Sequence, residues 1–226
     1  IKNIKKDFPI FKQKINGKPL VYLDSANSSQ KPKVVIDKIS NFYETEFSNV
    51  GRSVHTLAVK ATNRFEATRD KVQKYLNAKY REEILFTKGA TEAINLVASS
   101  YGKKYINKGD EILITELEHH SNYVPWNFLR TEKGAVIKFA QVNENGDVEI
   151  EEIKKHITNK TKIIAITHIS NVTGAVLPIT KIVDLAKEKN IPVLIDGTQG
   201  APHSEIDLQK MGCDFYAISC HKMYGP

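Results

Sequence analysis

The sequence has few cysteines and no long apolar run. Its two cysteines, Cys213 and Cys220, lack the C-x-x-C spacing of zinc and redox sites. So low a cysteine content also excludes a disulfide-stapled scaffold and favours a reducing compartment. The longest apolar runs, such as 163–166, are strand-sized and fall far short of the roughly twenty residues that cross a bilayer. We therefore expect no metal site and no association with a membrane.

The composition is that of an ordinary globular protein. Hydrophobic residues make up 41% and charged residues 26% of the chain, which disfavours collagen-like, disordered and membrane-spanning classes. The 33 Lys and Arg exceed the 26 Asp and Glu and give a formal net charge of +7. Because these cations are spread among carboxylates without a matching aromatic array, we expect no nucleic-acid partner.

From Glu83 onward, strand-length apolar runs alternate with amphipathic stretches. Residues 179–186 carry the i, i+3, i+4, i+7 spacing of a buried helical stripe, Gly212 suits the end of the next helix, and a further helix is expected over 91–99. The expected strands are rich in β-branched or aromatic residues and cover 84–86, 111–115, 135–139, 163–167, 193–195 and 215–218.

This alternation indicates βαβ units, and so an α/β fold with a mainly parallel sheet covered on both faces. In such sheets, ligands bind beyond the carboxyl ends of the strands. Residues 1–80 differ, because they contain an extended segment at 20–23, a turn-rich segment at 25–32 and a helix around Phe65, Val72 and Leu76.

Polar residues follow several of the expected strands. Gly89-Ala90-Thr91 leads into a helix, and its backbone N–H groups, hydroxyl and positive dipole end suit a phosphate. The alternative is a threonine that only caps the helix. The polar residues expected at this edge of the sheet are 89–91, 118–120, 170–171, 196, 199 and 219–222.

Three single residues at this edge have a chemical and a structural interpretation. Asp196 ends a buried strand, so its carboxylate needs a cationic or hydrogen-bonding partner, unless it caps the next helix. Lys222 follows another strand and suits an amine nucleophile, although a surface lysine is the default. His119 suits stacking on a planar cofactor, and otherwise is an ordinary polar residue; its neighbour does not share a helical face with it, so a dihistidine metal site is not expected.

Taken in order, six segments resemble the class V aminotransferase family of pyridoxal-phosphate enzymes, and most closely its cysteine desulfurases of the SufS type. The similarity covers essentially the whole chain. The segments are YLDSA (22–26), KGATEAIN (88–95), LEHHSN (117–122) leading to VPW (124–126), THISNVTG (167–174), DGTQ (196–199) and SCHKMYGP (219–226).

The resemblance implies a role for each candidate residue. Lys222 would bind pyridoxal 5'-phosphate covalently and move protons at the substrate α-carbon, while His119 would stack on the ring and act in proton transfer. Asp196 would pair with the pyridinium nitrogen and keep it protonated. The other implied cofactor-binding residues are Gln199 at the phenolic oxygen, Thr91, Ser219 and His221 at the phosphate, Ala90 beside Thr91, and Asn171 next to the ring, where it would also bind the substrate carboxylate.

The resemblance also implies a domain organisation. Residues 1–80 would form an amino-terminal segment and the start of the large domain, and residues 81–226 an incomplete pyridoxal-phosphate-binding large domain. This is the large domain of the fold type I transferases, with a mainly parallel seven-stranded sheet and a carboxyl-terminal small domain absent from this chain. The family's persulfide cysteine and substrate-binding arginine lie far downstream of the lysine, and neither Cys213 nor Cys220 matches that cysteine.

The implied function is conversion of L-cysteine to L-alanine and an enzyme-bound persulfide for iron-sulfur cluster assembly. The resemblance further implies a homodimer and a sulfur acceptor of the SufE or SufU kind, in the cytoplasm of a bacterium or in an organelle stroma or matrix. Alternatives are a selenocysteine lyase, a kynureninase-like enzyme, or a non-catalytic homologue or fragment. Departures from the family pattern at Asn27, Gly51 and Cys220 support the last of these.

Overall fold

The computed structural model describes residues 3–226, which form two compact units. The amino-terminal unit contains the residues up to Ile84 together with Cys220–Pro226. The sheet unit is Leu85–Ser219. The end of the chain therefore returns to the unit in which the chain begins.

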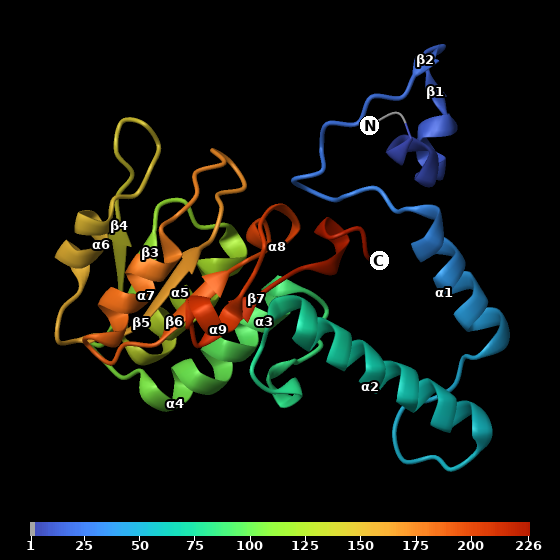
Figure 1. The fold of residues 1–226 in the computed structure, drawn as a ribbon. Helices are drawn as coiled ribbons and strands as arrows, with labels where there is room; N and C mark the ends of the chain where they lie inside the picture. Colours follow the sequence, from blue (N-terminus) through green and yellow to red (C-terminus); the bar gives the residue numbers. More distant parts are fainter. Residues whose placement is uncertain (1–2) are drawn as a thin grey trace. The chain divides into compact units, whose positions relative to one another are not determined.

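The sheet unit is built on a parallel sheet, so the expected α/β fold class is confirmed (Figure 1). The sheet has five strands in the order β4-β3-β5-β6-β7, and every neighbouring pair is parallel. Non-consecutive neighbours need crossover connections, which the intervening helices supply. The strands are β3 (Glu111–Thr115), β4 (Val136–Ala140), β5 (Thr161–Thr167), β6 (Val193–Asp196) and β7 (Phe215–Ala217).

The expected strand at 84–86 is wrong, and the sheet has five strands rather than seven. Residues 84–86 are extended but join no ladder among the described residues, and Leu85 and Phe86 are 69% and 44% exposed. An apolar run becomes a strand only where a neighbour accepts its backbone hydrogen bonds. The other five expected strands are confirmed within two residues at each end.

Alternate residues of the central strands face two separate cores. Leu113, Ile164 and Ile195 pack against helices α6 (Ile150–His156) and α7 (Ile179–Lys187). Ile112, Ile163 and Leu194 pack on the other face against α3 (Ala90–Val97) and α5 (Val124–Lys133). Burial on both faces explains why these strands are continuous apolar runs rather than alternating ones.

The remaining helical segments of this unit are short. The expected helix at 91–99 is α3 followed by a π-turn, and Gly212 ends α9 with a φ of +70°, as expected. Among residues 3–226, no helix combines the length and apolarity that a bilayer crossing requires. The short segments are the π-turn η4 (Ala98–Gly102), α4 (Lys103–Tyr105), η5 (His120–Asn122), α8 (Gly200–His203) and α9 (Leu208–Met211).

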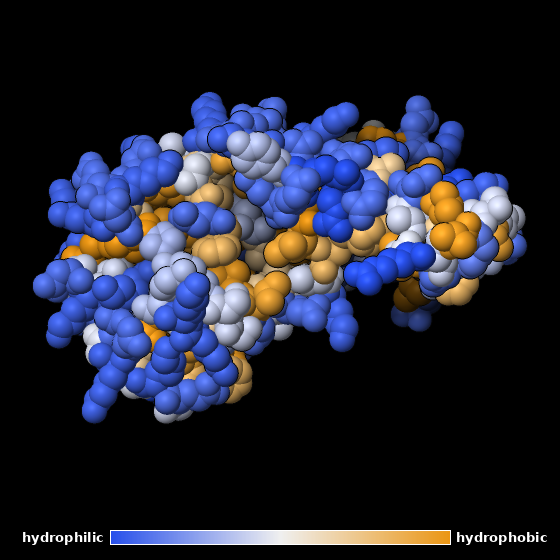
Figure 2. Space-filling model, turned by 90° about the horizontal axis from the view of Figure 1, so that it is seen from below, coloured by the Kyte–Doolittle hydropathy of each residue, from blue (hydrophilic) through white to orange (hydrophobic). Residues whose placement is uncertain are grey.

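The amino-terminal unit contains two longer helices, α1 (Lys33–Thr45) and α2 (Thr56–Leu76). The helix expected around Phe65 and Leu76 is confirmed as α2, whereas 20–23 contains no strand. No residue of α1 is buried. On the face of the molecule that Figure 2 shows, hydrophobic side chains lie among hydrophilic ones. The unit's short elements are η1 (Ile4–Asp7), η2 (Pro9–Lys12), β1 (Lys14–Ile15), β2 (Lys18–Pro19), η3 (Arg81–Glu83) and η6 (Cys220–Lys222).

The two thiols lie in different environments and should react at different rates. Burial, followed by the charge of Asp214, raises the pKa of the Cys213 thiol to about 12, whereas Cys220 is exposed. Only the thiolate is nucleophilic, so iodoacetamide should label Cys220 at least about tenfold faster than Cys213 in the folded protein. Peptide mass mapping measures both rates. Equal rates before unfolding in urea would contradict the placement of Cys213.

Candidate functional site

The carboxyl ends of neighbouring strands bring polar residues to one edge of the sheet. Thr167 at the end of β5 pairs with Asp196 at the end of β6, which in turn pairs with Ala217 at the end of β7. Ser219 comes two residues after β7, and His119 lies on the loop after β3. The order of the strands therefore places Thr167, Asp196 and Ala217 side by side at one edge of the sheet unit.

Asp196 is a buried carboxylate that accepts one hydrogen bond from the part of the chain that the structure describes. It is 3% exposed, and its Oδ1 accepts the Thr198 N–H at 3.0 Å. Within the described sheet unit it forms no ion pair, and the next helix, α8, begins later, with Gln199 as its N-cap residue. The interpretation of Asp196 as a helix cap is therefore wrong. The Thr198 Oγ1 is also buried and has no hydrogen-bond partner.

Two glycines fix the turn that follows Asp196. A Cβ on Gly197 would overlap the Tyr216 ring, and a Cβ on Gly200 would overlap the His168 ring. These rings contact each other, with His168 Nδ1 3.0 Å from the Tyr216 hydroxyl. Burial lowers the pKa of His168, which favours its neutral form. The His168 and Tyr216 rings pack against the two glycines of the turn. The chain can pass this close only because both positions lack a side chain.

The start of α3 lies against the segment after β7. The Ala90 N–H donates to the Ser219 Oγ at 2.9 Å, and Ser219 is 5% exposed. Gly89, with a φ of +144°, would place a Cβ 3.3 Å from that oxygen. The N-cap residue of α3 is Gly89, which has no side chain to cap it, and Thr91 lies inside the first turn, so the interpretation of Thr91 as a cap is wrong. The start of a helix beside the Thr91 and Ser219 hydroxyls fits a phosphate.

The His119 ring is held in one orientation by its own loop. Its Nδ1 lies 2.8 Å from the Ser121 Oγ and accepts the Ser121 N–H at 3.2 Å. An Nδ1 that accepts a backbone N–H leaves the proton of the neutral ring on Nε2. His119 is exposed, so a flat face and an N–H donor are accessible at the edge.

Asn171 is on a turn that Ser170 organises. The Ser170 Oγ accepts the N–H groups of Val172 and Thr173, each at 3.2 Å. Ser170 is buried, whereas Asn171 is exposed beyond the end of β5. Gln199 is buried, at 5% exposure, just after the Asp196 turn. Both amides therefore belong to the strand-end edge of the sheet unit.

Lys222 and His221 belong to the amino-terminal unit, on η6. Burial, and then the charges of Lys222 and Lys31, lower the pKa of His221, while a hydrogen bond to the Asn27 backbone raises it. Burial also lowers the pKa of Lys31, whose amine donates to the His221 carbonyl at 2.8 Å. The structure thus gathers Ala90, Thr91, Asn171, Asp196, Gln199, Ser219 and His119 in one unit and the two residues of η6 in the other.

Glu118 is one of the polar residues expected at this edge, although the sequence assigned it no role. Its Oε1 accepts the Thr115 hydroxyl at 2.7 Å and the Thr167 N–H at 2.9 Å, and its Oε2 accepts the Asn122 amide at 2.6 Å. Burial, with a smaller contribution from the charge of Asp196, raises its pKa to about 8 against the effect of these three donors. The carboxyl group therefore ties the ends of β3 and β5 to η5, next to His119.

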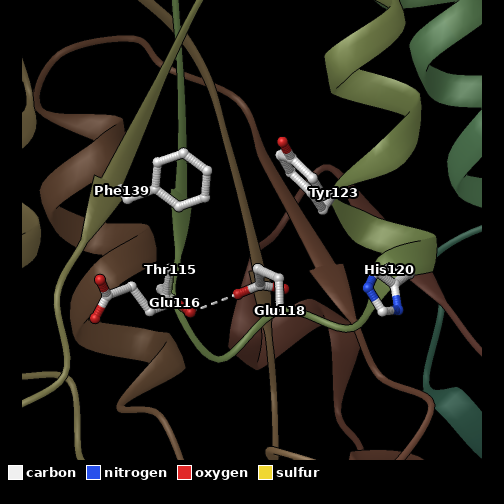
Figure 3. Close-up of a pocket in the computed structure, with 6 residues that line it drawn as sticks. All are labelled: Thr115, Glu116, Glu118, His120, Tyr123 and Phe139. Atoms are coloured by element: carbon white, nitrogen blue, oxygen red, sulfur yellow. Dashed lines mark hydrogen bonds between the residues drawn. The ribbon is translucent and has the colours of Figure 1, made fainter.

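A pocket of about 480 Å³ opens beside Glu118 (Figure 3). The rings of Tyr123 and Phe139 lie 5.9 Å apart between their centroids, and the Glu116 carboxylate accepts the Val142 N–H. Of the polar residues expected at this edge from the sequence, Glu118 and His120 line the pocket. It is lined by Thr115, Glu116, Glu118, His120, Tyr123 and Phe139.

The residues present fit pyridoxal phosphate. A buried carboxylate with no cationic partner among residues 3–226 suits a protonated ring nitrogen, and the Thr198 Oγ1 has no hydrogen-bond partner within the same range. The α3 start with Ser219 suits the phosphate, and the His119 face suits the ring. Glu118 and Thr198 lie in segments that the sequence singled out, but their surroundings depend on tertiary contacts and could not be predicted.

Replacing Glu118 with Gln should change how stability depends on pH. A carboxyl pKa raised from 4.5 to about 8 favours the folded state at low pH, and that contribution is lost as the pH rises through 8. The loss is at most about 1.4 kcal/mol per pH unit, and less because the residue keeps some contact with water. Glu118→Gln should flatten this fall in urea-unfolding free energy between about pH 5 and pH 8.

Glu116→Gln is the matched control, because Glu116 is exposed in the same loop. It should keep the wild-type fall with pH. A Glu118→Gln profile parallel to that of Glu116→Gln would contradict the buried, protonated state of Glu118.

Comparison with known proteins places this site in a family. The model of the Aminotransferase class-V family matches residues 21–226. A probable cysteine desulfurase of Halalkalibacterium halodurans is 48% identical over 99% of this chain and 55% of its own length. A cysteine desulfurase of Synechococcus elongatus is 44% identical over the whole chain and 36% of its own length. The chain thus spans about half or less of these curated relatives.

Solved structures agree with the sequence relatives. The cysteine desulfurase CsdA of Escherichia coli superimposes with a TM-score of 0.87 at 36% identity, over 100% of this chain and 55% of that one. A cysteine desulfurase of Thermococcus onnurineus superimposes with a TM-score of 0.92 at 33% identity, over 100% and 54%. By its sequence match and its fold, the chain belongs to the class V aminotransferase family.

Proposed function

We propose that the whole protein is a pyridoxal-phosphate-dependent cysteine desulfurase of the SufS type. The observation that carries the proposal is the strand-end edge, where a buried Asp196 without a cationic partner lies beside an unpartnered Thr198 hydroxyl. Relatives that bear the name cysteine desulfurase at 44–48% identity support the reaction class over a selenocysteine lyase or a kynureninase-like enzyme. The sulfur would go to iron-sulfur cluster assembly.

Each residue has a role that its surroundings support. Asp196 would hold a proton on the ring nitrogen, because a buried carboxylate stabilises a cation next to it. Gln199 would donate to the phenolic oxygen, and His119, oriented by Ser121, would cover the ring face. The phosphate would be held by Thr91, Ser219 and His221, beside Ala90, whose N–H anchors Ser219.

The chemistry at the substrate would be divided between the cofactor and the chain. When bound, pyridoxal phosphate supplies an electron sink for the substrate α-carbon. Lys222 would hold the cofactor covalently and move the α-proton, and Asn171 would bind the carboxylate of L-cysteine. The thiolate that takes the sulfur is proposed in the part of the relatives that this chain does not span, since the raised pKa of Cys213 makes it unsuited.

The assembly and partners follow from the same resemblance. We propose a homodimer that passes persulfide sulfur to an acceptor protein of the SufE or SufU kind. The domain boundary near residue 80, between an amino-terminal segment and a large domain at 81–226, is proposed on the same basis.

Lys222→Ala in the full-length protein should abolish cofactor absorbance and alanine formation from L-cysteine, because no other amine would replace the covalent link. Lys210→Ala, on an exposed position of α9, is the control and should behave as wild type. Spectra and alanine assays measure both effects. An unchanged spectrum in Lys222→Ala would refute the lysine assignment. Release of alanine from selenocysteine but not from cysteine would favour the lyase.

Asp196→Ala should leave cofactor bound but slow α-proton abstraction by about ten- to a hundredfold, the factor equivalent to one hydrogen bond between charged groups. Loss of α-deuterium from labelled cysteine measures this step. Asp184→Ala, an exposed carboxylate on α7, should have no effect. Exchange at the wild-type rate in Asp196→Ala would rule out the pairing with the ring nitrogen.

A further inference from the structure

The carbonyl of His221, which belongs to the peptide bond that enters Lys222, attracts several hydrogen-bond donors. The Ser29 N–H and the Ser29 Oγ each lie 3.0 Å from this oxygen, and the Lys31 amine lies 2.8 Å away. The Ser28 hydroxyl is more distant, at 3.3 Å. A carbonyl oxygen has two lone pairs, so this oxygen is fully used. One loop, residues 28–31, therefore holds the peptide plane just before Lys222.

The same serine holds the chain after Lys222. The Ser29 Oγ accepts the Tyr224 N–H at 2.8 Å. Tyr224 has a φ of +63°, a left-handed conformation that is unfavourable for a bulky side chain, and its ring lies 5.9 Å from that of Phe8. A conformation of this kind persists only where the surroundings impose it. The Ser29 hydroxyl is one of the groups that impose it.

Ser29 is suited to this double contact by its chemistry and its burial. A hydroxyl donates one hydrogen bond and accepts others, so a single Oγ can donate to His221 and accept from Tyr224. Ser29 is 5% exposed, so water does not readily replace these bonds. Its loop is held in turn by Tyr22, whose hydroxyl donates to the Ser28 carbonyl at 2.6 Å.

We propose that Ser29, assisted by Lys31, is a positioning residue for Lys222, fixing the backbone on both sides of the lysine so that its long side chain starts from one orientation. The proposal rests on the proposed function of Lys222. A lysine side chain has several rotatable bonds, and a fixed backbone removes the largest source of variation in where its amine arrives. Ser29 need not touch the cofactor to have this effect.

The test compares Ser29→Ala with Ser28→Ala in the full-length protein. The two serines are adjacent. The Ser28 hydroxyl makes the longer contact of 3.3 Å with the His221 carbonyl, and Ser28 is less buried than Ser29. In cofactor-free protein, Ser29→Ala should speed hydrogen exchange of the Tyr224 amide by about tenfold, the factor expected for two lost hydrogen bonds. Ser28→Ala should change it by less than about twofold.

A second readout concerns Lys222 itself. Ser29→Ala should weaken pyridoxal-phosphate binding about fivefold or more and shift the pH midpoint of the cofactor absorbance, because the amine is less well placed. If Ser29→Ala does not fold, Lys31→Met, which removes only the amine donor, takes its place with the same expected directions. Equal exchange and equal midpoints in the two alanine variants would overturn the positioning role and leave the proposed function standing. A wild-type protein without cofactor absorbance would overturn both.

Discussion

The parallel pairing of β5 with β6 is the constraint on which the rest of the site depends. It places Thr167 opposite Asp196 at the same edge of the sheet, where the Thr167 N–H binds Glu118. Because both faces of the sheet are covered by helices, the strand ends are the open end of a dry core. Burial of a carboxylate at that position costs free energy unless a partner binds it. The buried Asp196 therefore suits a cationic ring nitrogen as that partner.

Two carboxyl groups, those of Glu118 and Asp196, lie at this edge in different surroundings. Glu118 receives three donors, yet burial and the charge of Asp196 raise its pKa to about 8, so near neutral pH its carboxyl is largely protonated. When protonated, Glu118 therefore places no second negative charge near Asp196. In the amino-terminal unit, Ser29 and Lys31 act on η6 through backbone contacts. In both units, candidate residues are contacted by neighbours to which the sequence assigned no role.

The sequence predicted the strands whose apolar runs are long and buried, such as β3 and β5, because burial on both faces leaves a continuous signal. It failed at 84–86, where an equally apolar run joins no strand ladder among the described residues, and it did not predict α1, whose apolar residues are not buried. The motifs predicted Asp196 and His119 as candidates. The sequence placed Glu118 at the edge without a role and gave no indication of Ser29, because the importance of both depends on contacts with Thr167 and His221, which are distant in sequence.

The central claim is the proposal that Lys222 binds pyridoxal phosphate covalently. Borohydride reduction of the full-length protein after incubation with the cofactor, followed by peptide mass mapping, tests it most directly. The account predicts a pyridoxyl label confined to Lys222. A label on another lysine, or no label in a demonstrably folded protein, would contradict it.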